Sequence, residues 1–390
     1  MDHKNPGRIE LFTPGPVTPP SYVTQAMSRA IVHHRSPAFG KVYSELASGI
    51  GTALESKATV LVLASSATGA MDAVVSSLFA EGDEVLVPVM GKFSSRWAEI
   101  CRVYGVKPHV MEIAPGLSPA PEAVADMLWR NEQIAGLLLT HSETSTGSLT
   151  DLKGVLETVR GLEAGGRRIL NCADCVSSFC VDELRMDPWG LDCVISASQK
   201  GLLSPAGLSF VCLGERAQRA LARSPARNYY LNLADYVACA ARAETPFTPA
   251  VSLMYAVGAA LERILDIGLN EVWDWGASSA NAIRHVLEAA GFEPLAANQS
   301  SAVVAFWVGD MDAEGIAACL ENEHNIYLAR GQGDLRGRIL RISPIGKTRG
   351  ELLYLFEALL ETVGKMGRRV NIEEARDSGG GFLKGSDIWA

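Results

Sequence analysis

The chain has 390 residues, of which 48% are hydrophobic and 20% are charged, and its formal net charge at pH 7 is −9. This length and composition can fill one large core and a second, smaller one. The acidic balance, without any block of basic residues, argues against nucleic acid or an anionic membrane as the main partner, so we expect a small-molecule ligand. The amino-terminal segment lacks the apolar core of a signal peptide, and no apolar run reaches the roughly 20 residues of a membrane span. We therefore expect a cytoplasmic globular protein.

Eight cysteines are scattered along the chain, most of them within apolar runs. Reduced cysteine in such a run behaves as a small hydrophobic residue, which favours a reducing compartment. Cys172 and Cys175 form a C-x-x-C pair that could indicate redox or zinc chemistry. No second pair and no nearby histidine completes a metal-binding set, so we expect no metal.

The order of the predicted elements begins with an arm over residues 1–20, where Thr13-Pro14-Gly15-Pro16 and Pro19-Pro20 favour extended backbone. After the arm, short apolar strands alternate with helices. This alternation predicts a large α/β domain over residues 21–250, with a mainly parallel sheet covered by helices on both faces. The strands are expected at 59–64, 84–89, 136–140, 168–172, 193–197 and 208–213, and the helices at 69–79, 121–130 and 152–162.

The pattern changes near residue 250, where long helical periodicity begins. The segment 251–375 is predicted to form a smaller α+β domain. We expect its helices at 250–267, 271–290, 313–323 and 349–365, and its strands at 302–306 and 339–342. The glycine-rich segment 376–390 is predicted to be a flexible tail.

Lys200 is the first candidate for a functional residue because it closely follows the short apolar strand 193–197 and precedes a turn at Pro205-Ala206-Gly207. A lysine at a strand end can face a cleft. Desolvation or a neighbouring charge can lower the pKa of such an amine, which can then form a Schiff base with an aldehyde cofactor. A solvated surface lysine is the alternative, so the rest of the chain must supply the other parts of a cofactor site.

Two further segments offer parts of such a site, each with a structural alternative. Ser65–Ala70 follows a strand and opens a helix, so its N–H groups and hydroxyls could hold a phosphate, or the turn could serve packing alone. Asp174 lies at the carboxyl edge of the predicted sheet, where its carboxylate could protonate the nitrogen of a pyridine ring. It could equally cap a turn with Ser177 and Ser178.

An aromatic ring and a polar run complete the candidates. Phe93 follows another strand end, where its ring could stack on a cofactor or belong to the core. His141–Gly147 places seven polar or small residues directly after a buried strand, an arrangement that structure alone seldom requires.

Taken together, these segments resemble the class V pyridoxal-phosphate aminotransferases, and most of all the branch of alanine–glyoxylate and serine–glyoxylate (serine–pyruvate) aminotransferases. The resemblance covers about residues 10–365 and implies the fold type I of pyridoxal-phosphate transferases. The segments that carry it are Thr13-Pro14-Gly15-Pro16, His34–Phe39, His141–Gly147, Asp174 with Val176-Ser177-Ser178, and Ser196–Gly201.

The resemblance also implies roles for individual residues. Lys200 would hold the aldehyde of pyridoxal 5′-phosphate, and Asp174 would pair with its pyridine nitrogen. Thr144 would lie near the ring and Gln199 would contact the cofactor. Phe93 matches a position where the family commonly stacks an aromatic side chain on the ring.

Phosphate and substrate contacts follow from the same resemblance. The turn Ser66-Ala67-Thr68 matches the phosphate-binding turn, with Ala67 in place of a common glycine, and Thr248 matches a residue that completes this site from a neighbouring subunit. A homodimer with shared active sites is therefore implied. Arg341 matches the arginine that binds the substrate carboxylate, and Gly15 would add a backbone contact. Strand alternation alone leaves open whether Arg341 faces solvent or the cleft.

The expected reaction is a ping-pong transamination between a small amino acid, alanine or serine, and a 2-oxo acid such as glyoxylate or pyruvate. In it, Lys200 would move a proton and Asp174 would keep the ring nitrogen protonated. A 2-aminoethylphosphonate transaminase, another class V enzyme such as a lyase, and a non-catalytic aminotransferase-like subunit remain alternatives. A desulfurase is disfavoured because residues 324–346 contain no cysteine.

Overall fold

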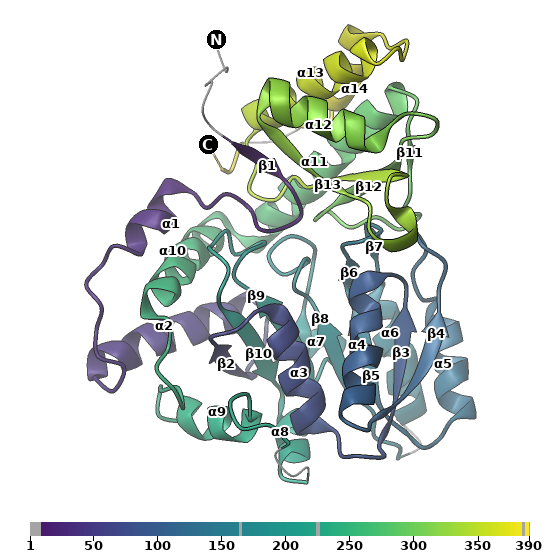
Figure 1. The fold of residues 1–390 in the computed structure, drawn as a ribbon. Helices are drawn as coiled ribbons and strands as arrows, with labels where there is room; N and C mark the ends of the chain where they lie inside the picture. Colours follow the sequence, from purple (N-terminus) through teal and green to yellow (C-terminus); the bar gives the residue numbers. More distant parts are fainter. Residues whose placement is uncertain (1–8, 164–165, 224–226, 384–386, 390) are drawn as a thin grey trace.

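The computed structural model describes residues 9–163, 166–223, 227–383 and 387–389. They form one seven-stranded sheet, one five-stranded sheet and a two-stranded ribbon, with helices around both larger sheets. In Figure 1 the smaller sheet lies above the unit that contains the larger sheet. Within the described ranges, no helix combines the length and the apolar character that a membrane crossing requires.

The larger sheet is mainly parallel, as the alternating pattern predicts. Its order is β2-β10-β9-β8-β5-β3-β4, and only β10 runs antiparallel to its neighbours. Six strands, β2, β3, β4, β5, β8 and β9, therefore end at the same edge. The strands are β2 (Thr59–Leu63), β3 (Glu84–Val89), β4 (Lys107–Glu112), β5 (Ile134–Thr140), β8 (Leu170–Asp174), β9 (Cys193–Ala197) and β10 (Ser209–Leu213).

Both faces of this sheet are buried, which explains why its strands are continuous apolar runs. Side chains alternate between two cores: Val60 and Val62 of β2 belong to one, and Leu61 and Leu63 to the other. One face carries α2 (Pro37–Ala53), α5 (Pro121–Arg130), α6 (Leu152–Glu163), α7 (Met186–Trp189) and α10 (Val251–Ile267). The other face carries α3 (Ala67–Leu78), α4 (Lys92–Val103), α8 (Glu215–Leu221) and α9 (Leu233–Ala240).

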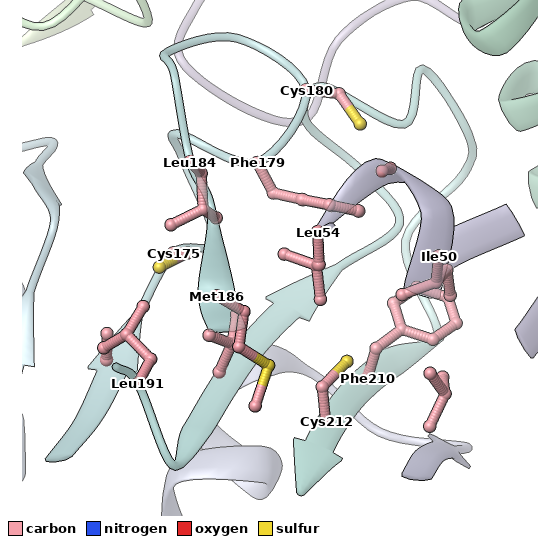
Figure 2. Packing of buried hydrophobic residues seen from close by; sticks show 14 of the residues in the cluster. Ile50, Leu54, Cys175, Phe179, Cys180, Leu184, Met186, Leu191, Phe210 and Cys212 are labelled. Carbon is pink, nitrogen blue, oxygen red and sulfur yellow. The ribbon is translucent and has the colours of Figure 1, made fainter. Parts of the chain in front are cut away.

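Figure 2 shows part of the first core, where Ile50 and Leu54 from the end of α2 lie near Phe210 and Cys212 of β10 and near Met186. The described cysteines are all free. Cys172 and Cys175 belong to the cores on opposite faces of the sheet. Their side chains therefore serve as core residues.

The smaller sheet has the order β1-β13-β14-β12-β11 and is antiparallel except where β1 pairs with β13. Its strands are β1 (Glu10–Phe12), β11 (Glu293–Pro294), β12 (Val304–Trp307), β13 (Ile326–Arg330) and β14 (Ile339–Ile342). One face packs against α11 (Leu269–Ala289), α12 (Ala313–His324), α13 (Arg349–Lys365) and α14 (Ile372–Gly380). The arm thus contributes a strand to the smaller sheet before α1 (Ser21–Ala26) begins.

The structure differs from the expected organisation at two places. Helix α10, placed in the smaller domain by its periodicity, packs against α2 and α1 and shares the core of the larger sheet. Helix α14 occupies the first part of the predicted flexible tail, because Ala375 and Gly379 pack between α11 and α13. The domain boundaries at residues 20, 250 and 375 stay predictions.

Candidate active site

Lys200 lies just beyond the carboxyl end of β9, at the shared edge of six strands. Its side chain is buried, with 8% of its surface exposed. The amine Nζ donates to the hydroxyl Oγ of Ser177 at 2.7 Å and to Oγ1 of Thr144 at 3.3 Å. Those two hydroxyls also lie 2.6 Å apart. The amine is therefore held by neutral groups, with no carboxylate in its hydrogen-bonding shell within the described residues.

Burial sets the charge of this amine. Desolvation lowers the pKa of Lys200 to about 8, and Arg341 adds to the lowering, whereas Asp174 and Glu143 act in the opposite direction. A minority of the molecules, far larger than for an ordinary lysine, then carries a neutral, nucleophilic amine near neutral pH. The solvated surface lysine that the sequence left open is not what the structure contains.

Asp174 is the last residue of β8 and pairs with Thr140 of β5 and Ile195 of β9. Its carboxylate is buried and accepts a hydrogen bond from the N–H of Val176 at 2.9 Å. Burial raises the pKa of Asp174 to about 6, against the lowering by this hydrogen bond and by Lys200. The group is still mostly ionised at neutral pH, so it can pair with a protonated ring nitrogen. Asp174 can therefore cap the turn at Val176 and still pair with a ring nitrogen.

The polar run 141–147 is buried throughout. It contains the short strand β6 (Ser142–Glu143), which pairs with β7 (Ser148–Leu149). His141 lies 2.9 Å from the hydroxyl of Ser178 through Nδ1, and burial lowers the pKa of its imidazole to about 3. A neutral His141 therefore supports the loop after β8 and takes no part in proton transfer.

Glu143 holds the start of α4. Its carboxylate, fully buried, accepts from the N–H groups of Phe93 and Ser94 at 2.8–3.2 Å and from the hydroxyls of Ser94 at 2.8 Å and Ser145 at 2.5 Å. The N–H groups of Phe93 and Ser94 belong to the first turn of α4, where backbone donors have no partner within the helix. A Cβ at Gly91 would lie 2.6 Å from this carboxyl group, so only glycine fits there. Glu143 thereby fixes the position of Phe93.

The ring of Phe93 faces two cations. Nζ of Lys200 lies 5.6 Å from the ring centroid and the guanidinium carbon of Arg96 lies 5.2 Å from it. Phe93 is partly exposed, in contrast to a core side chain. The structure thus brings the predicted stacking ring to Lys200.

The turn Ser66-Ala67-Thr68 forms the amino terminus of α3. Ser66 occupies the N-cap position, and its side chain makes no capping hydrogen bond. The free N–H groups of the first helical turn and the helix dipole make such a terminus favourable for an anion. Oγ1 of Thr68 accepts a hydrogen bond from Nη1 of Arg96 at 3.0 Å. This turn therefore faces the first turns of α4.

Arg341 lies on β14, on the face opposite to Leu340 and Ile342, and is buried. Its guanidinium donates to the carbonyls of Thr144 and Arg330, both at 2.8 Å, with a longer bond of 3.3 Å from Nε to Arg330. Burial lowers its pKa to about 10, so it stays charged at neutral pH. Three of the five N–H donors are used, which leaves two for a carboxylate. The bond to Thr144 places the arginine beside the lysine site.

The arm reaches the site through Gly15 and Val17. The N–H of Val17 donates to the carbonyl of Gln199 at 3.2 Å. Gly15 has a φ of +119°, and a Cβ built on it would lie 2.9 Å from two carbons of the Lys200 side chain. Glycine is required here both by its backbone conformation and by the closeness of the lysine.

Thr248 does not join this group: it is exposed, and none of the contacts in the described part of the chain links it to Lys200 or to the α3 turn. Its neighbour Thr245 is buried, and the carbonyl of Thr245 accepts from Arg35 at 2.7 Å. Three side chains that the sequence did not single out do belong to the site. Ser177 bonds the lysine, Glu143 caps α4, and Arg96 reaches Thr68.

Comparisons with known proteins agree with this arrangement. Residues 21–335 match the family model "Aminotransferase class-V". The chain is 34% identical to a protein of Synechococcus sp. (strain PCC 6716) named soluble hydrogenase, small subunit, over 86% of this chain and 88% of that one. It is 30% identical to L-aspartate–glyoxylate aminotransferase of Paracoccus denitrificans, over 89% and 87% of the two chains.

A solved structure extends the agreement to three dimensions. The chain superimposes on an aspartate aminotransferase of subgroup IV from Thermus thermophilus with a TM-score of 0.84 and 36% sequence identity, covering 91% of this chain and 99% of the other. The matching family model covers most of the chain and includes Lys200, Asp174 and the α3 turn. The chain belongs to the class V aminotransferase family.

Proposed function

We propose that this protein is a pyridoxal 5′-phosphate-dependent aminotransferase that transfers the amino group of alanine or serine to a 2-oxo acid such as glyoxylate or pyruvate. One observation carries the proposal. A buried lysine with a lowered pKa meets only hydroxyl groups, and a buried carboxylate lies at the same edge of the larger sheet. A buried arginine from β14 of the smaller sheet reaches this place by donating to the carbonyl of Thr144. Packing alone does not require these three charges in one place.

The residues present fit the cofactor. The amine of Lys200, which bonds only to hydroxyl groups, can form a covalent bond with the aldehyde of the cofactor. Asp174 can pair with the ring nitrogen, and the ring of Phe93 offers a stacking surface. The N-cap of α3 makes no side-chain hydrogen bond of its own, which leaves the N–H groups of that turn for the phosphate. When bound, pyridoxal 5′-phosphate supplies an aldehyde and a ring that accepts electrons.

Lys200 is the group that moves the proton. Its Nζ lies beside Ser177 and Thr144, and its pKa of about 8 would let it accept and return a proton near neutral pH when it is not bound to the cofactor. Asp174 keeps the adjoining ring nitrogen protonated because an ionised carboxylate stabilises the positive charge. The two groups thus divide the work of proton transfer and charge stabilisation.

Arg341 is proposed to bind the substrate carboxylate. Its two remaining N–H donors suit the parallel hydrogen bonds that a carboxylate accepts, and the carbonyls of Thr144 and Arg330 fix its orientation. The choice of glyoxylate as acceptor rests on relatives named L-aspartate–glyoxylate and serine–glyoxylate aminotransferases, and that of pyruvate on a relative named pyridoxamine–pyruvate transaminase.

A homodimer and a cytoplasmic location are part of the proposal. Thr248 is exposed, and none of the contacts among the described residues links it to Lys200 or to the α3 turn, so it is free to complete the phosphate site of a second copy. The eight cysteines are all free, which suits a reducing compartment.

The test has two steps. The protein is loaded with pyridoxal 5′-phosphate, reduced with borohydride and digested, and the peptides are analysed by mass spectrometry. The pyridoxyl mass is expected on Lys200. Alanine, serine and aspartate are then assayed against glyoxylate, pyruvate and phosphonoacetaldehyde. Label on other lysines only, or label on Lys200 without turnover of any pair, would contradict the proposal.

A second candidate function is an aminotransferase-like subunit of a redox assembly, favoured by the printed name of the Synechococcus relative. Such a subunit has no physical need for the lysine, the carboxylate and the arginine together. The same experiment separates the two candidates. A redox subunit leaves Lys200 unlabelled and shows no amino transfer. An aminotransferase is labelled on Lys200 and transfers amino groups.

A further inference from the structure

Arg96 is a cation in the site for which the resemblance supplies no role. It lies on α4, one turn after Phe93, and its guanidinium carbon is 5.2 Å from the centroid of that ring. Nη1 donates to Oγ1 of Thr68 at 3.0 Å. Glu143 fixes the start of α4, so the positions of Phe93 and Arg96 are set by the same carboxylate.

The guanidinium of Arg96 acts through space on the carboxylate of Asp174, whose pKa it lowers. Among the described residues, none of the ion pairs of the structure includes Arg96. Thr68 belongs to the first turn of α3, where the helix dipole is positive. A guanidinium directed at this end of a helix is repelled unless an anion lies between the two. Lys200, also near the ring of Phe93, adds further positive charge.

We propose that Arg96 binds the phosphate of the cofactor together with the α3 turn. The proposal rests on the proposed function and adds a phosphate ligand to it. A dianionic phosphate at this place accepts from the N–H groups of α3, from Thr68 and from the guanidinium. Arg96 would keep its place over the ring of Phe93, and that ring would stack on the cofactor.

This arrangement has an alternative that makes a different prediction. Arg96 could bind the distal carboxylate of a dicarboxylic donor such as aspartate. In that case its loss changes the KM for aspartate and leaves cofactor affinity unchanged. The short contact with Thr68 favours the phosphate, because Thr68 lies at the helix terminus.

The test is the equilibrium affinity of the cofactor-free protein for two ligands, pyridoxal 5′-phosphate and pyridoxal, which lacks the phosphate. Four proteins are compared: wild type, Arg96→Gln, Arg96→Lys and Arg102→Gln. Arg102 is the matched control, because it lies exposed in the last turn of the same helix. Thermal melting of each variant confirms that it is folded.

Arg96→Gln is expected to weaken binding of pyridoxal 5′-phosphate by about 10- to 100-fold, the range of a charge-assisted hydrogen bond, and binding of pyridoxal by less than about threefold. Arg96→Lys should restore part of the loss and Arg102→Gln should match wild type. Equal weakening for both ligands, or a change confined to the KM for aspartate, would overturn the proposal. Failure of wild type to bind pyridoxal 5′-phosphate at all would instead refute the proposed function.

Discussion

Two buried lysines show how similar side chains come to serve different ends. Lys347, in the loop after β14, has an exposed side-chain fraction of 4% and pairs with the carboxylates of Glu10 and Glu351, each at 3.0 Å. Lys200 is comparably buried, yet its amine meets only Ser177 and Thr144. Burial alone therefore does not identify a reactive lysine.

The two lysines differ in the groups that surround the positive charge of the amine. Around Lys347, two carboxylates compensate for the loss of water, and the pair joins β1 to α13. Around Lys200, the nearest carboxylate, Asp174, acts through space and leaves the pKa lowered. Lys347 is thus expected to be a structural cation, and Lys200 an amine kept ready for chemistry.

Replacement of each lysine by methionine is the strongest way to break this comparison. Lys200→Met should reduce transamination by about a thousandfold or more, because both the covalent bond and the proton transfer are lost. Its melting temperature should not fall, since a poorly solvated amine gives way to an apolar side chain. Lys347→Met should lower the free energy of unfolding by about 3–5 kcal/mol, because two carboxylates lose their partner.

Thermal and chemical denaturation, with the transamination assay alongside, check this contrast. A destabilised Lys200→Met together with an unaffected Lys347→Met would reverse the assignment of the two lysines. The folded fraction of Lys347→Met should still be labelled on Lys200 after borohydride reduction.

Asp174→Asn tests the carboxylate that tunes the lysine site. We expect kcat to fall by about 10²- to 10³-fold, because the ring nitrogen loses the charge that keeps it protonated. Cofactor affinity should change far less, since the phosphate and the lysine still bind. Steady-state kinetics and a cofactor titration measure the two effects. A loss of affinity as large as the loss of kcat would instead mean that Asp174 mainly holds the cofactor.

The smallest expected effect is a pH dependence of cofactor capture. Only the neutral amine of Lys200 attacks an aldehyde, so the second-order rate of capture should rise about tenfold per pH unit and level off above about pH 8. Burial destabilises the charged form of the Lys200 amine in the folded protein, whereas water stabilises that form in the unfolded chain. The cofactor-free fold should therefore gain stability as the pH rises from about 8 towards 10.5, the ordinary pKa of lysine. A capture midpoint near 10.5 would show that burial does not act on Lys200 as we infer. A small lysine analogue serves as the reference.

The strands of the larger sheet could be predicted because both of their faces are buried. The bounds of β3 and β9 match the apolar runs at 84–89 and 193–197. Strand β4, at the edge of the sheet, was not predicted, since its sequence Lys-Pro-His-Val-Met-Glu is half polar and contains no buried residue. Helix α4 was also not predicted, and the carboxylate that caps its amino terminus, Glu143, lies 50 residues further along the chain from Phe93.

Site residues divide in the same way. Lys200 and Asp174 could be predicted because each follows an apolar strand, and parallel strands bring their carboxyl ends together. The direction of the Arg341 side chain could not be predicted, because it depends on the contact between β14 and the carbonyl of Thr144 in the polar run. Arg96 and Glu143 could not be predicted, because their roles depend on contacts between α4 and segments distant in the sequence.

The arm has a mechanical consequence. It is fastened to the smaller sheet where the carbonyl of Phe12 accepts from Ser343 at 2.8 Å, and to the lysine loop where Val17 meets Gln199. Only four residues connect these anchors, and Gly15 among them touches Lys200. The same short segment joins the smaller sheet to the lysine loop, so we expect a fusion partner or truncation that disturbs β1 to affect the reaction as well as the fold.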